Sequence, residues 1–379
     1  MAGRFSLDVS ILREVLDRLN LGVYVTDTER HILLWNKKAE EITGHKAENV
    51  AGTACYDGVL NHIDKDGHLL CFTDLCPLNR AITLGKQSDV PILVYAQKAD
   101  GKRVPVSVSV APLYDANGEV IGGIETFRDE SRALADLEFA GKIQRSILPK
   151  RLPAVGSLRF DAVYYPHDLV GGDFYDVRPL GDDRFSFIVA DVRGHGVSGA
   201  LYTMWLRSLE DAFKSYLDEP GRFLAALNSE LARLLVSESF ATAICGVVDA
   251  GTSEVTYCNA GHPPLLHYHA AAGETTPLEN HGLPVGISAG EEYECDSMTL
   301  APGDVLLAYT DGITDIETAS SSGPKSTALG EEGLIRILHS QISQGRADLL
   351  ERIYLAALDA CQQVSPSDDV LLFSIAREP

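Results

Sequence analysis

Two short runs decide the fold of the second half of this chain: Val170-Gly-Gly-Asp-Phe-Tyr-Asp-Val177 and Ala190-Asp-Val-Arg-Gly-His-Gly196. Each places an aspartate beside glycines, and the apolar residues 184–190 between them predict a buried strand. Asp173 then precedes this strand and Asp191 follows it. A carboxylate at a strand end, next to glycines that let the backbone approach a ligand, suits a hard cation held by oxygen atoms. Taken singly, either run is also what turn-forming and helix-capping aspartates produce.

Two further runs near the C-terminus carry aspartates at strand ends. In Leu306-Leu-Ala-Tyr-Thr-Asp-Gly-Ile-Thr314, Asp311 ends an apolar strand and is followed by glycine. In Ser367-Asp-Asp-Val-Leu-Leu372, Asp368 and Asp369 start the last strand. Four such strand ends can converge on one edge of a β-sandwich and hold two divalent ions. Ligands that offer only oxygen favour Mg or Mn over Zn, and two ions about 4 Å apart can generate hydroxide and hold a phosphoryl group in line.

Length and composition fit a globular protein of two domains. The chain has 379 residues, of which 45% are hydrophobic and 23% are charged. No apolar run reaches the roughly 18 residues that span a bilayer, and the N-terminus lacks a signal-peptide pattern, so we expect a cytoplasmic protein with no membrane segment. The net charge of -22 is uneven, because -17 of it falls in residues 131–379. An acidic second half argues against binding to nucleic acid.

Residues 10–130 have the order of elements of a sensor domain. After a lead-in helix at 6–20, the pattern predicts strands and helices separated by Asp-Gly and Asn-Gly turns. Strands are expected at 21–26, 31–35, 90–97, 103–114 and 120–128, and helices at 37–43 and 78–84. This order resembles a PAS domain, as do Gly22-Val-Tyr-Val-Thr-Asp27, Trp35-Asn36, Ala39-Glu-Glu-Ile-Thr-Gly44 and Asp100-Gly-Lys-Arg-Val-Pro-Val106. PAS domains bind many ligands or none, so the resemblance implies the fold and leaves the signal open.

Residues 131–155 form a predicted helical connector that ends at Pro149 and Pro153. One face of this helix carries apolar residues and one glutamine: Leu137, Ala140, Ile143, Gln144 and Ile147. A polar Gln144 in an apolar seam can fix the register of two paired helices. One interpretation is therefore a homodimer through the PAS domain and the connector helix. The other is a helix packed on its own domain.

Residues 156–379 alternate strands with helices. Strands are predicted at 158–165, 184–190, 242–249, 254–259, 264–269, 295–300, 304–309 and 370–375, and helices at 197–216, 222–235, 331–341 and 346–361. This order resembles an α/β sandwich of two antiparallel sheets flanked by helices. The expected fold class is α+β, with an N-terminal PAS domain of antiparallel sheet and helices, the helical connector and this C-terminal sandwich.

Six ordered motifs make the second half similar to one family. They are Gly171-Gly-Asp-Phe-Tyr-Asp176, Ala190-Asp-Val-Arg-Gly-His-Gly196, Asn259-Ala-Gly-His-Pro-Pro264, Gly282-Leu-Pro-Val-Gly286, Tyr309-Thr-Asp-Gly312 and Asp368-Asp369. Together they resemble the SpoIIE/RsbU branch of metal-dependent protein phosphatases (the PPM family), which are relatives of protein phosphatase 2C. The run Gln144-Arg-Ser-Ile-Leu-Pro149 is similar to the segment that enters the domain in this branch.

The resemblance implies metal-binding and catalytic roles for the matching residues. Asp191 would bridge two Mn or Mg ions, and the backbone carbonyl of Val192 would help to hold one of them. Asp311 and Asp368, with Asp369 beside them, would complete the other site. A hydroxide activated by the two metals would attack phosphorus, and the serine or threonine oxygen would leave without a covalent enzyme intermediate.

Other residues in these motifs have more open interpretations. By the same resemblance, Asp173 would bind through a metal-bound water and orient the nucleophile. Arg193 stands where relatives often have a small residue, and it either touches the phosphate or points into solvent. Val-Leu follows Asp369 where a threonine is common, which leaves open what supports the preceding aspartate. His195 and His262 could serve as general acids, but bracing of the glycine turns accounts for them without a catalytic role.

The seven cysteines are unevenly distributed. Cys55, Cys71 and Cys76, together with His62, lie in the region that walls a PAS pocket. They could bind zinc or an iron–sulfur cluster, take part in redox chemistry, or pack as thiols. A flavin adduct at Cys55 is a further alternative, although the Asn and Arg that surround such a cysteine in light sensors are absent. The other four have apolar neighbours and are expected to be unpaired core thiols: Cys245, Cys258, Cys295 and Cys361.

These motifs lead to one expected function and two alternatives. We expect a PAS-regulated serine/threonine protein phosphatase that uses two Mn or Mg ions. By resemblance, its substrate would be a phosphorylated anti-sigma-factor antagonist of the STAS type, in a pathway of sigma-factor regulation. One alternative is a non-catalytic PAS-linked scaffold, which the retention of all four strand-end aspartates disfavours. The other is a phosphatase that acts on small phosphomonoesters.

Overall fold

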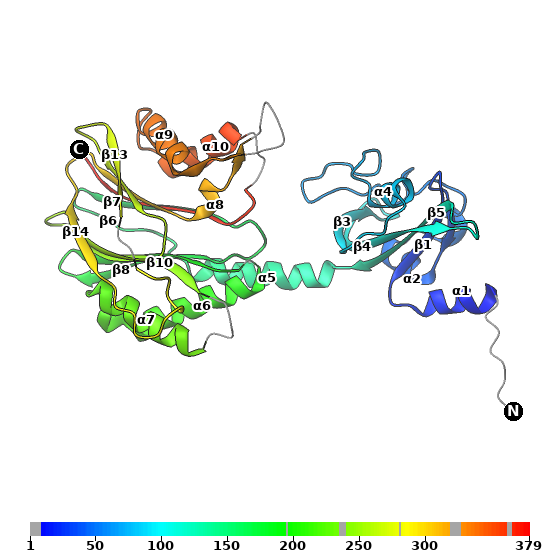
Figure 1. The fold of residues 1–379 in the computed structure, drawn as a ribbon, viewed down its shortest axis with the longest axis horizontal. Helices are drawn as coiled ribbons and strands as arrows, with labels where there is room; N and C mark the ends of the chain where they lie inside the picture. Colours follow the sequence, from blue (N-terminus) through cyan, green and yellow to red (C-terminus); the bar gives the residue numbers. More distant parts are fainter. Residues whose placement is uncertain (1–8, 195, 235–239, 280–281, 319–326, 362–365) are drawn as a thin grey trace. The chain divides into compact units, whose positions relative to one another are not determined.

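The structure, a computed structural model, describes residues 9–194, 196–234, 240–279, 282–318, 327–361 and 366–379 (Figure 1). The chain divides into two compact units, Met1–Asp136 and Leu137–Pro379. Their boundary falls inside one helix, α5 (Ser131–Ile147). Within these described ranges, every helix is too short or too polar to cross a bilayer.

The N-terminal unit is built on an antiparallel sheet of five strands in the order β2-β1-β5-β4-β3. The strands are β1 (Gly22–Asp27), β2 (Ile32–Trp35), β3 (Ile92–Gln97), β4 (Arg103–Tyr114) and β5 (Val120–Asp129). The helices are α1 (Val9–Arg18), α2 (Lys37–Thr43), α3 (Ala47–Val50) and α4 (Pro77–Leu84). Every second residue of β4 faces the core, as the two-residue period of a strand requires. The predicted PAS-like sheet with helices is confirmed.

Asn36 fixes the junction between β2 and α2. Its Oδ1 accepts hydrogen bonds from the backbone N–H groups of Val23 at 2.8 Å and Ala39 at 2.9 Å. The second of these bonds caps the N-terminus of α2. Its Nδ2 donates to the carbonyls of Leu16 at 2.8 Å and Leu21 at 2.9 Å. One buried amide therefore satisfies four backbone groups, and this is the structural role of the asparagine in the Trp35-Asn36 pair.

The C-terminal unit contains two antiparallel sheets. The first has the order β14-β11-β10-β9-β8 and the second the order β13-β12-β15-β18-β7-β6. The strands of the first sheet are β8 (Asp173–Gly181), β9 (Arg184–Val192), β10 (Ala241–Asp249), β11 (Glu254–Ala260) and β14 (Cys295–Thr299). Those of the second are β6 (Ala154–Val155), β7 (Leu158–Tyr165), β12 (Leu265–His269), β13 (Glu274–Leu278), β15 (Val305–Tyr309) and β18 (Val370–Arg377). A short separate pair is formed by β16 (Glu317–Thr318) and β17 (Thr327–Ala328).

Helices cover the outer faces of both sheets and give a four-layer sandwich (Figure 1). The first sheet packs against α6 (Val197–Ala212), the short helix η1 (Lys214–Tyr216) and α7 (Pro220–Leu234). The second packs against α9 (Gly330–Ile342) and α10 (Leu349–Cys361), with α8 (Asp311–Thr314) near the end of β15. A third core, between the sheets, contains Phe160, Phe187 and Phe373. The predicted sandwich flanked by helices is confirmed.

Strand β8 was not predicted, and β9 is longer than expected. Asp173 does not precede the sheet in a loop but begins β8, and Asp191 lies within β9 rather than beyond it. The two strands are antiparallel and their register pairs Asp173 with Asp191. Because the backbone ladder continues to this edge, both carboxylates are held on strands rather than on loops.

Two cysteines form a disulfide, contrary to the expectation of unpaired core thiols. Cys258 on β11 and Cys295 on β14 are bonded, and the antiparallel register places them directly opposite each other. Cross-strand neighbours of this kind bring their Cα atoms to 4.3 Å, within reach of a disulfide. The prediction holds for Cys245 and Cys361, which are free and buried.

Candidate active site

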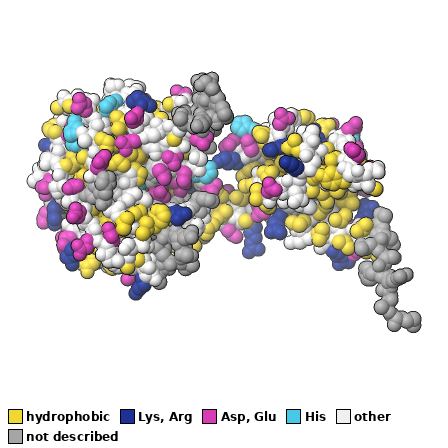
Figure 2. Space-filling model, viewed as in Figure 1, with side chains coloured by type: hydrophobic (Ala, Val, Ile, Leu, Met, Phe, Trp, Pro, Cys, Tyr) yellow, Lys and Arg dark blue, Asp and Glu magenta, His cyan; other side chains and the backbone are white. Residues whose placement is uncertain are grey.

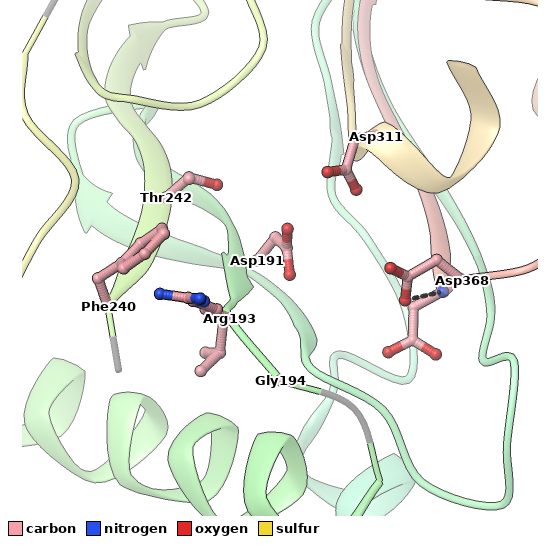
Figure 3. Close-up of a pocket in the computed structure, with 9 residues that line it drawn as sticks. Asp191, Arg193, Gly194, Phe240, Thr242, Asp311 and Asp368 are labelled. Atoms are coloured by element: carbon pink, nitrogen blue, oxygen red, sulfur yellow. Dashed lines mark hydrogen bonds between the residues drawn. The ribbon is translucent and has the colours of Figure 1, made fainter. Parts of the chain in front are cut away.

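A cavity of about 260 Å³ lies where β9, β15 and β18 reach one edge of the sandwich (Figure 3). Its lining comes from strands of the first sheet and from segments beside strands of both sheets: Asp191, Val192, Arg193, Gly194, Phe240, Thr242, Asp311, Asp368 and Asp369. The structure therefore brings together five of the six residues predicted to hold metal, although they are up to 178 positions apart in the sequence. In Figure 3, Asp191 extends from β9 toward Asp311, the first residue of α8, and Asp368, in the segment before β18.

Asp173, the sixth predicted residue, is not in this lining; it is 2% exposed and pairs with Asp191 across β8 and β9. The hydroxyl of Thr310 donates to its Oδ2 at 2.8 Å and accepts from the backbone N–H of Leu371 at 2.9 Å. Thr310 thus holds Asp173 in one orientation and ties it to β18. We assigned no role to this threonine from the sequence; its position directly before Asp311 was the available signal.

Asp368 and Asp369 are adjacent in the chain but have different surroundings. Asp368 is exposed, and its Oδ1 accepts the backbone N–H of Asp369 at 2.8 Å, the dashed line in Figure 3. This bond supplies the support that the missing threonine left open. Asp369 is 6% exposed, and its carboxylate accepts the N–H groups of His167 at 2.8 Å and Gly172 at 2.6 Å. It therefore anchors the segment that leads into β8.

Gly312 allows α8 to approach the start of β18. A Cβ at this position would lie 1.9 Å from the carbonyl oxygen of Asp369, a distance that no side chain can occupy. The contact places Asp311, the first residue of α8, beside Asp368. The Asp-Gly pair thus combines a carboxylate that lines the cavity with the only residue small enough for the approach.

The carboxylates of the site raise one another's pKa values. Burial raises the pKa of Asp173, and the charges of Asp191 and Asp369 raise it further. Burial also raises the pKa of Asp191, with further contributions from Asp311 and Asp368. Like charges at this density need either protons or cations between them. The donor set is entirely oxygen, so these residues fit hard divalent ions such as Mg or Mn.

Arg193 directly follows the end of β9. It lines the cavity, and its guanidinium carbon is 5.3 Å from the centroid of the Phe240 ring. A cation–π contact of this kind helps to orient the guanidinium. The surface of the C-terminal unit seen in Figure 2 carries many more acidic than basic side chains. The positive charge of Arg193 in this cavity is therefore surrounded by a predominantly acidic surface.

His262 braces a turn and is unsuited to donate a proton. Its backbone N–H donates to Asn259 Oδ1 at 2.7 Å, and Asn259 Nδ2 donates back to its carbonyl at 2.9 Å. Its Nδ1 lies 2.8 Å from the hydroxyl of Thr242. Burial lowers the pKa of His262 to about 3, so the ring is neutral at pH 7. The other histidine considered, His195, lies outside the described residues.

Gln144 packs inside the C-terminal unit and is 4% exposed. Its Nε2 donates to the carbonyl of Gly171 at 2.6 Å and to the hydroxyl of Thr203 at 2.9 Å. The N–H of Gly171 donates to its Oε1 at 3.1 Å. The amide is thus used within its own domain, as the second interpretation of the connector expected. It cannot at the same time set the register of a paired helix.

The predicted sensor residues also come together, inside the PAS domain. Cys55, His62, Cys71 and Cys76 are each 3% exposed. The thiols of Cys71 and Cys76 are near enough to shift each other's pKa, and the N–H of His62 donates to Cys71 Sγ at 3.1 Å. Over the described ranges, sets of three ligand atoms lying within 4.8 Å of one another contain only histidine and aspartate. The cysteines are therefore not arranged as a preformed zinc or iron–sulfur site.

Comparison with known families agrees with this architecture. Residues 181–378 match the family model described as Stage II sporulation protein E (SpoIIE), and residues 20–132 match that of a PAS domain. The first match covers more than half of the chain, so the protein belongs to the SpoIIE family. The family resemblance of the sequence is confirmed.

Individual relatives are similar over parts of their length. The chain is 28% identical to Protein IcfG of Synechocystis sp. over 271 residues, which covers 64% of this chain and 41% of that protein. It is 31% identical to the phosphoserine phosphatase RsbP of Bacillus subtilis over 188 residues, covering 48% and 45% of the two chains. It therefore spans less than half the length of these two curated relatives. The solved SiaA-PP2C domain of Pseudomonas aeruginosa superposes with a TM-score of 0.57 at 25% identity, covering 66% of this chain and 98% of that domain.

Proposed function

We propose that the chain is a signal-regulated protein phosphatase that hydrolyses phosphoserine or phosphothreonine on a regulatory protein. The observation that carries the proposal is the convergence of Asp191, Asp311 and Asp368 on one cavity, with Arg193 in the same lining. Crowded carboxylates bind divalent ions, and a guanidinium beside them suits a phosphate dianion. The similarity to a phosphoserine phosphatase and membership of the SpoIIE family support this assignment.

Each residue of the site has a task in this proposal. Asp191, the carbonyl of Val192, Asp311 and Asp368 would hold two Mn or Mg ions. When bound, the ions would supply Lewis-acid charge and a hydroxide nucleophile near neutral pH. Asp369 would act mainly by fixing the segment before β8, because its carboxylate already accepts two backbone N–H groups.

The remaining residues would orient the reactants. Asp173, held by Thr310, would accept a hydrogen bond from the attacking water, so that a lone pair of the water oxygen points toward phosphorus. Arg193 would bind the non-bridging phosphate oxygens and stabilise the charge that they gain in the transition state. The bond between phosphorus and the serine or threonine oxygen would break as water oxygen bonds to phosphorus. The leaving oxygen would take its proton from solvent, since His262 is neutral and faces Thr242.

In this proposal the choice of substrate rests on membership of the SpoIIE family, and the regulation rests on the PAS domain. The substrate in this proposal is a phosphorylated STAS-type anti-sigma-factor antagonist in the cytoplasm. The PAS domain would set the activity through α5, which contains the last residues of one unit and the first of the other. Pairing of two chains through the PAS domain and the exposed face of α5 remains part of the proposal, without Gln144 in the seam.

The test has two parts on the full-length protein. Hydrolysis of para-nitrophenyl phosphate that requires added Mn, and that EDTA abolishes, would distinguish an enzyme from a scaffold. Rates with a phosphorylated STAS-domain protein and with free phosphoserine would distinguish a protein phosphatase from one for small esters. Absence of turnover on all three substrates with Mn or Mg would overturn the proposal.

A further inference from the structure

The PAS domain buries a group of ionisable side chains that the proposed phosphatase reaction does not use. Its members are at most 3% exposed: Cys55, His62, Cys71, Cys76 and Glu125. Neither carboxylate oxygen of Glu125 has a hydrogen-bond partner, and His62 Nε2 lies 3.8 Å from its Oε1. Buried polar groups are normally paired, since each unpaired one destabilises the fold. Five ionisable side chains buried in the core of one small domain indicate a chemical function in addition to packing.

Two of the three thiols lie near each other below one exposed segment. Arg30 Nη1 contacts both residues, at 2.9 Å from the carbonyl oxygen of Cys71 and 3.7 Å from Cys76 Sγ, and each thiol shifts the pKa of the other. All four residues between them, 72–75, are exposed. The two buried sulfurs therefore lie at the ends of one short surface segment.

The surroundings of Cys76 stabilise a negative charge on its sulfur. Cys76 is the N-cap of α4, and the backbone N–H of Asn79, in the first turn of that helix, is close enough to lower the pKa of the thiol. Arg30 Nη1 lies 3.7 Å from the same sulfur and donates to the carbonyl of Cys71 at 2.9 Å. The Arg30 guanidinium is itself held over the ring of Tyr56, 4.2 Å from the centroid.

The three thiols consequently differ in acidity. Pairing with the Cys71 thiol lowers the pKa of Cys76, and the Asn79 N–H and Arg30 lower it further, against the opposing effect of burial. The same pairing raises the pKa of Cys71, which keeps its proton. Burial and the charge of Glu125 raise the pKa of Cys55 to about 12. Tyr24 adds no charge, because burial raises its pKa as well.

We propose that Cys76 and Cys71 are a redox-active dithiol, in which Cys76 reacts with a hydroperoxide and Cys71 then closes a reversible disulfide. The Cys76 thiolate attacks the peroxide oxygen, the O–O bond breaks, and the released alkoxide or hydroxide takes a proton from solvent. The sulfenic acid formed at Cys76 is attacked by the sulfur of Cys71. The S–O bond breaks and water leaves with the thiol proton, so the two cysteines have lost two electrons to the peroxide.

The first experiment maps oxidation on the full-length protein. Both cysteines lie in one tryptic peptide, residues 66–80, which contains no other cysteine. Protein reduced and handled without air is treated with hydrogen peroxide and digested. We expect this peptide to lose two hydrogen atoms and to regain them with dithiothreitol. Cys71→Ser should stop at a sulfenic acid on Cys76 that dimedone traps, whereas the matched control Cys361→Ser, a buried thiol of the other unit, should behave like wild type.

The second experiment tests the role of Arg30 and needs no cysteine variant. Arg30→Met removes the guanidinium beside Cys76, and Arg13→Met makes the same change at an exposed position on α1. Because less thiolate is present at neutral pH, oxidation of peptide 66–80 in Arg30→Met should be several-fold slower than in wild type. Arg13→Met should match wild type.

Three results would overturn the proposal. Peptide 66–80 could stay reduced while peroxide oxidises other thiols of the same sample. Arg30→Met and wild type could react at the same rate over the pH range from 5 to 8. Freshly purified protein could contain stoichiometric zinc or iron that protects both cysteines from alkylation, which would make this a metal site instead.

Discussion

Truncation of Gln144 should weaken both the C-terminal unit and its affinity for metal. This side chain joins α5 to the segment ahead of β8 through three hydrogen bonds, two of them to Gly171. Gly141, one turn earlier on α5, lies so close to this segment that a Cβ there would be 2.2 Å from the carbonyl oxygen of Leu169. The next residue after Gly171 donates to Asp369, and Asp173 follows it. Gln144 is thus linked to Asp369 through Gly171 and Gly172, although it does not line the cavity.

The size of the effect follows from the groups left without partners. In Gln144→Ala, both the N–H and the carbonyl of Gly171 lose buried partners, and each loss costs about 1–3 kcal/mol. We therefore expect the free energy of unfolding of the C-terminal unit to fall by about 2–5 kcal/mol. If about 1.4 kcal/mol of this loss appears as disorder of the segment before β8, the Mn concentration for half-maximal activity should rise about tenfold.

Three variants distinguish this coupling from general damage to the helix. Gln144→Glu can still accept the N–H of Gly171 but cannot donate to its carbonyl, so it should be intermediate or worse. Lys142→Ala, at an exposed position of the same helix, is the matched control. Urea unfolding is followed by the fluorescence of Trp205 in a Trp35→Phe background, since these are the two tryptophans of the chain. Gln144→Ala within about 0.5 kcal/mol of Lys142→Ala would refute the argument. A loss of stability with unchanged Mn dependence would refute its link to the site.

Four other predictions test separate parts of the molecule. Asp191→Asn and Asp311→Asn should each lower kcat for an aryl phosphate by more than tenfold without unfolding the protein, and near wild-type turnover would contradict the metal assignment. Arg193→Ala should raise KM for phosphorylated protein more than Arg193→Lys does; equal effects would mean that the guanidinium does not contact phosphate. Burial raises the pKa of Glu125 from 4.5 to about 8. The folded state therefore keeps this proton while the unfolded state loses it, so PAS stability should fall as pH rises through that window. Trp35 fluorescence should show this decline flattened in Glu125→Gln, and an unchanged slope would contradict it. One residue inserted near Asp136 should uncouple or lock phosphatase activity, whereas seven residues should largely preserve control; identical behaviour of the two insertions would make the connector a tether.

The fold was predictable where local pattern and tertiary structure agree. β4 has the alternation of a half-buried strand and its bounds were predicted correctly, as were those of α2 between Asn36 and Gly44. β8 was missed because its residues do not alternate: its first five are all buried, and the strand begins directly after Gly171-Gly172. Local sequence propensity predicts a loop for such a glycine-rich start. Pairing with β9 overrides that propensity, which a single sequence does not reveal.

The aspartates that converge on the candidate site were predictable, and the groups that hold them in place were not. Aspartates at strand ends are visible because both the carboxylate and the apolar strand leave a local mark. The partners of those aspartates are distant: Thr310 reaches Asp173 across 137 residues, and Asp369 reaches Gly172 across 197. Gln144 was noticed for the right reason, a polar residue on an apolar face, but its partners were sought on a second chain. Its true partners are backbone groups of its own domain, which carry no signal in the side-chain sequence.

The pair Asp368-Asp369 was predicted to supply two metal ligands at the start of the last strand. In the structure β18 begins at Val370, and both aspartates line the cavity from the segment before it. Asp368 is exposed, whereas Asp369 is buried against the N–H groups of His167 and Gly172. These different surroundings favour Asp368 as the ligand and Asp369 as the support. Asp369→Asn tests this division: an amide oxygen can still accept one of the two N–H groups. We accordingly expect Asp369→Asn to lose less Mn affinity than Asp368→Asn and more stability, and the reverse order would assign the ligand to Asp369.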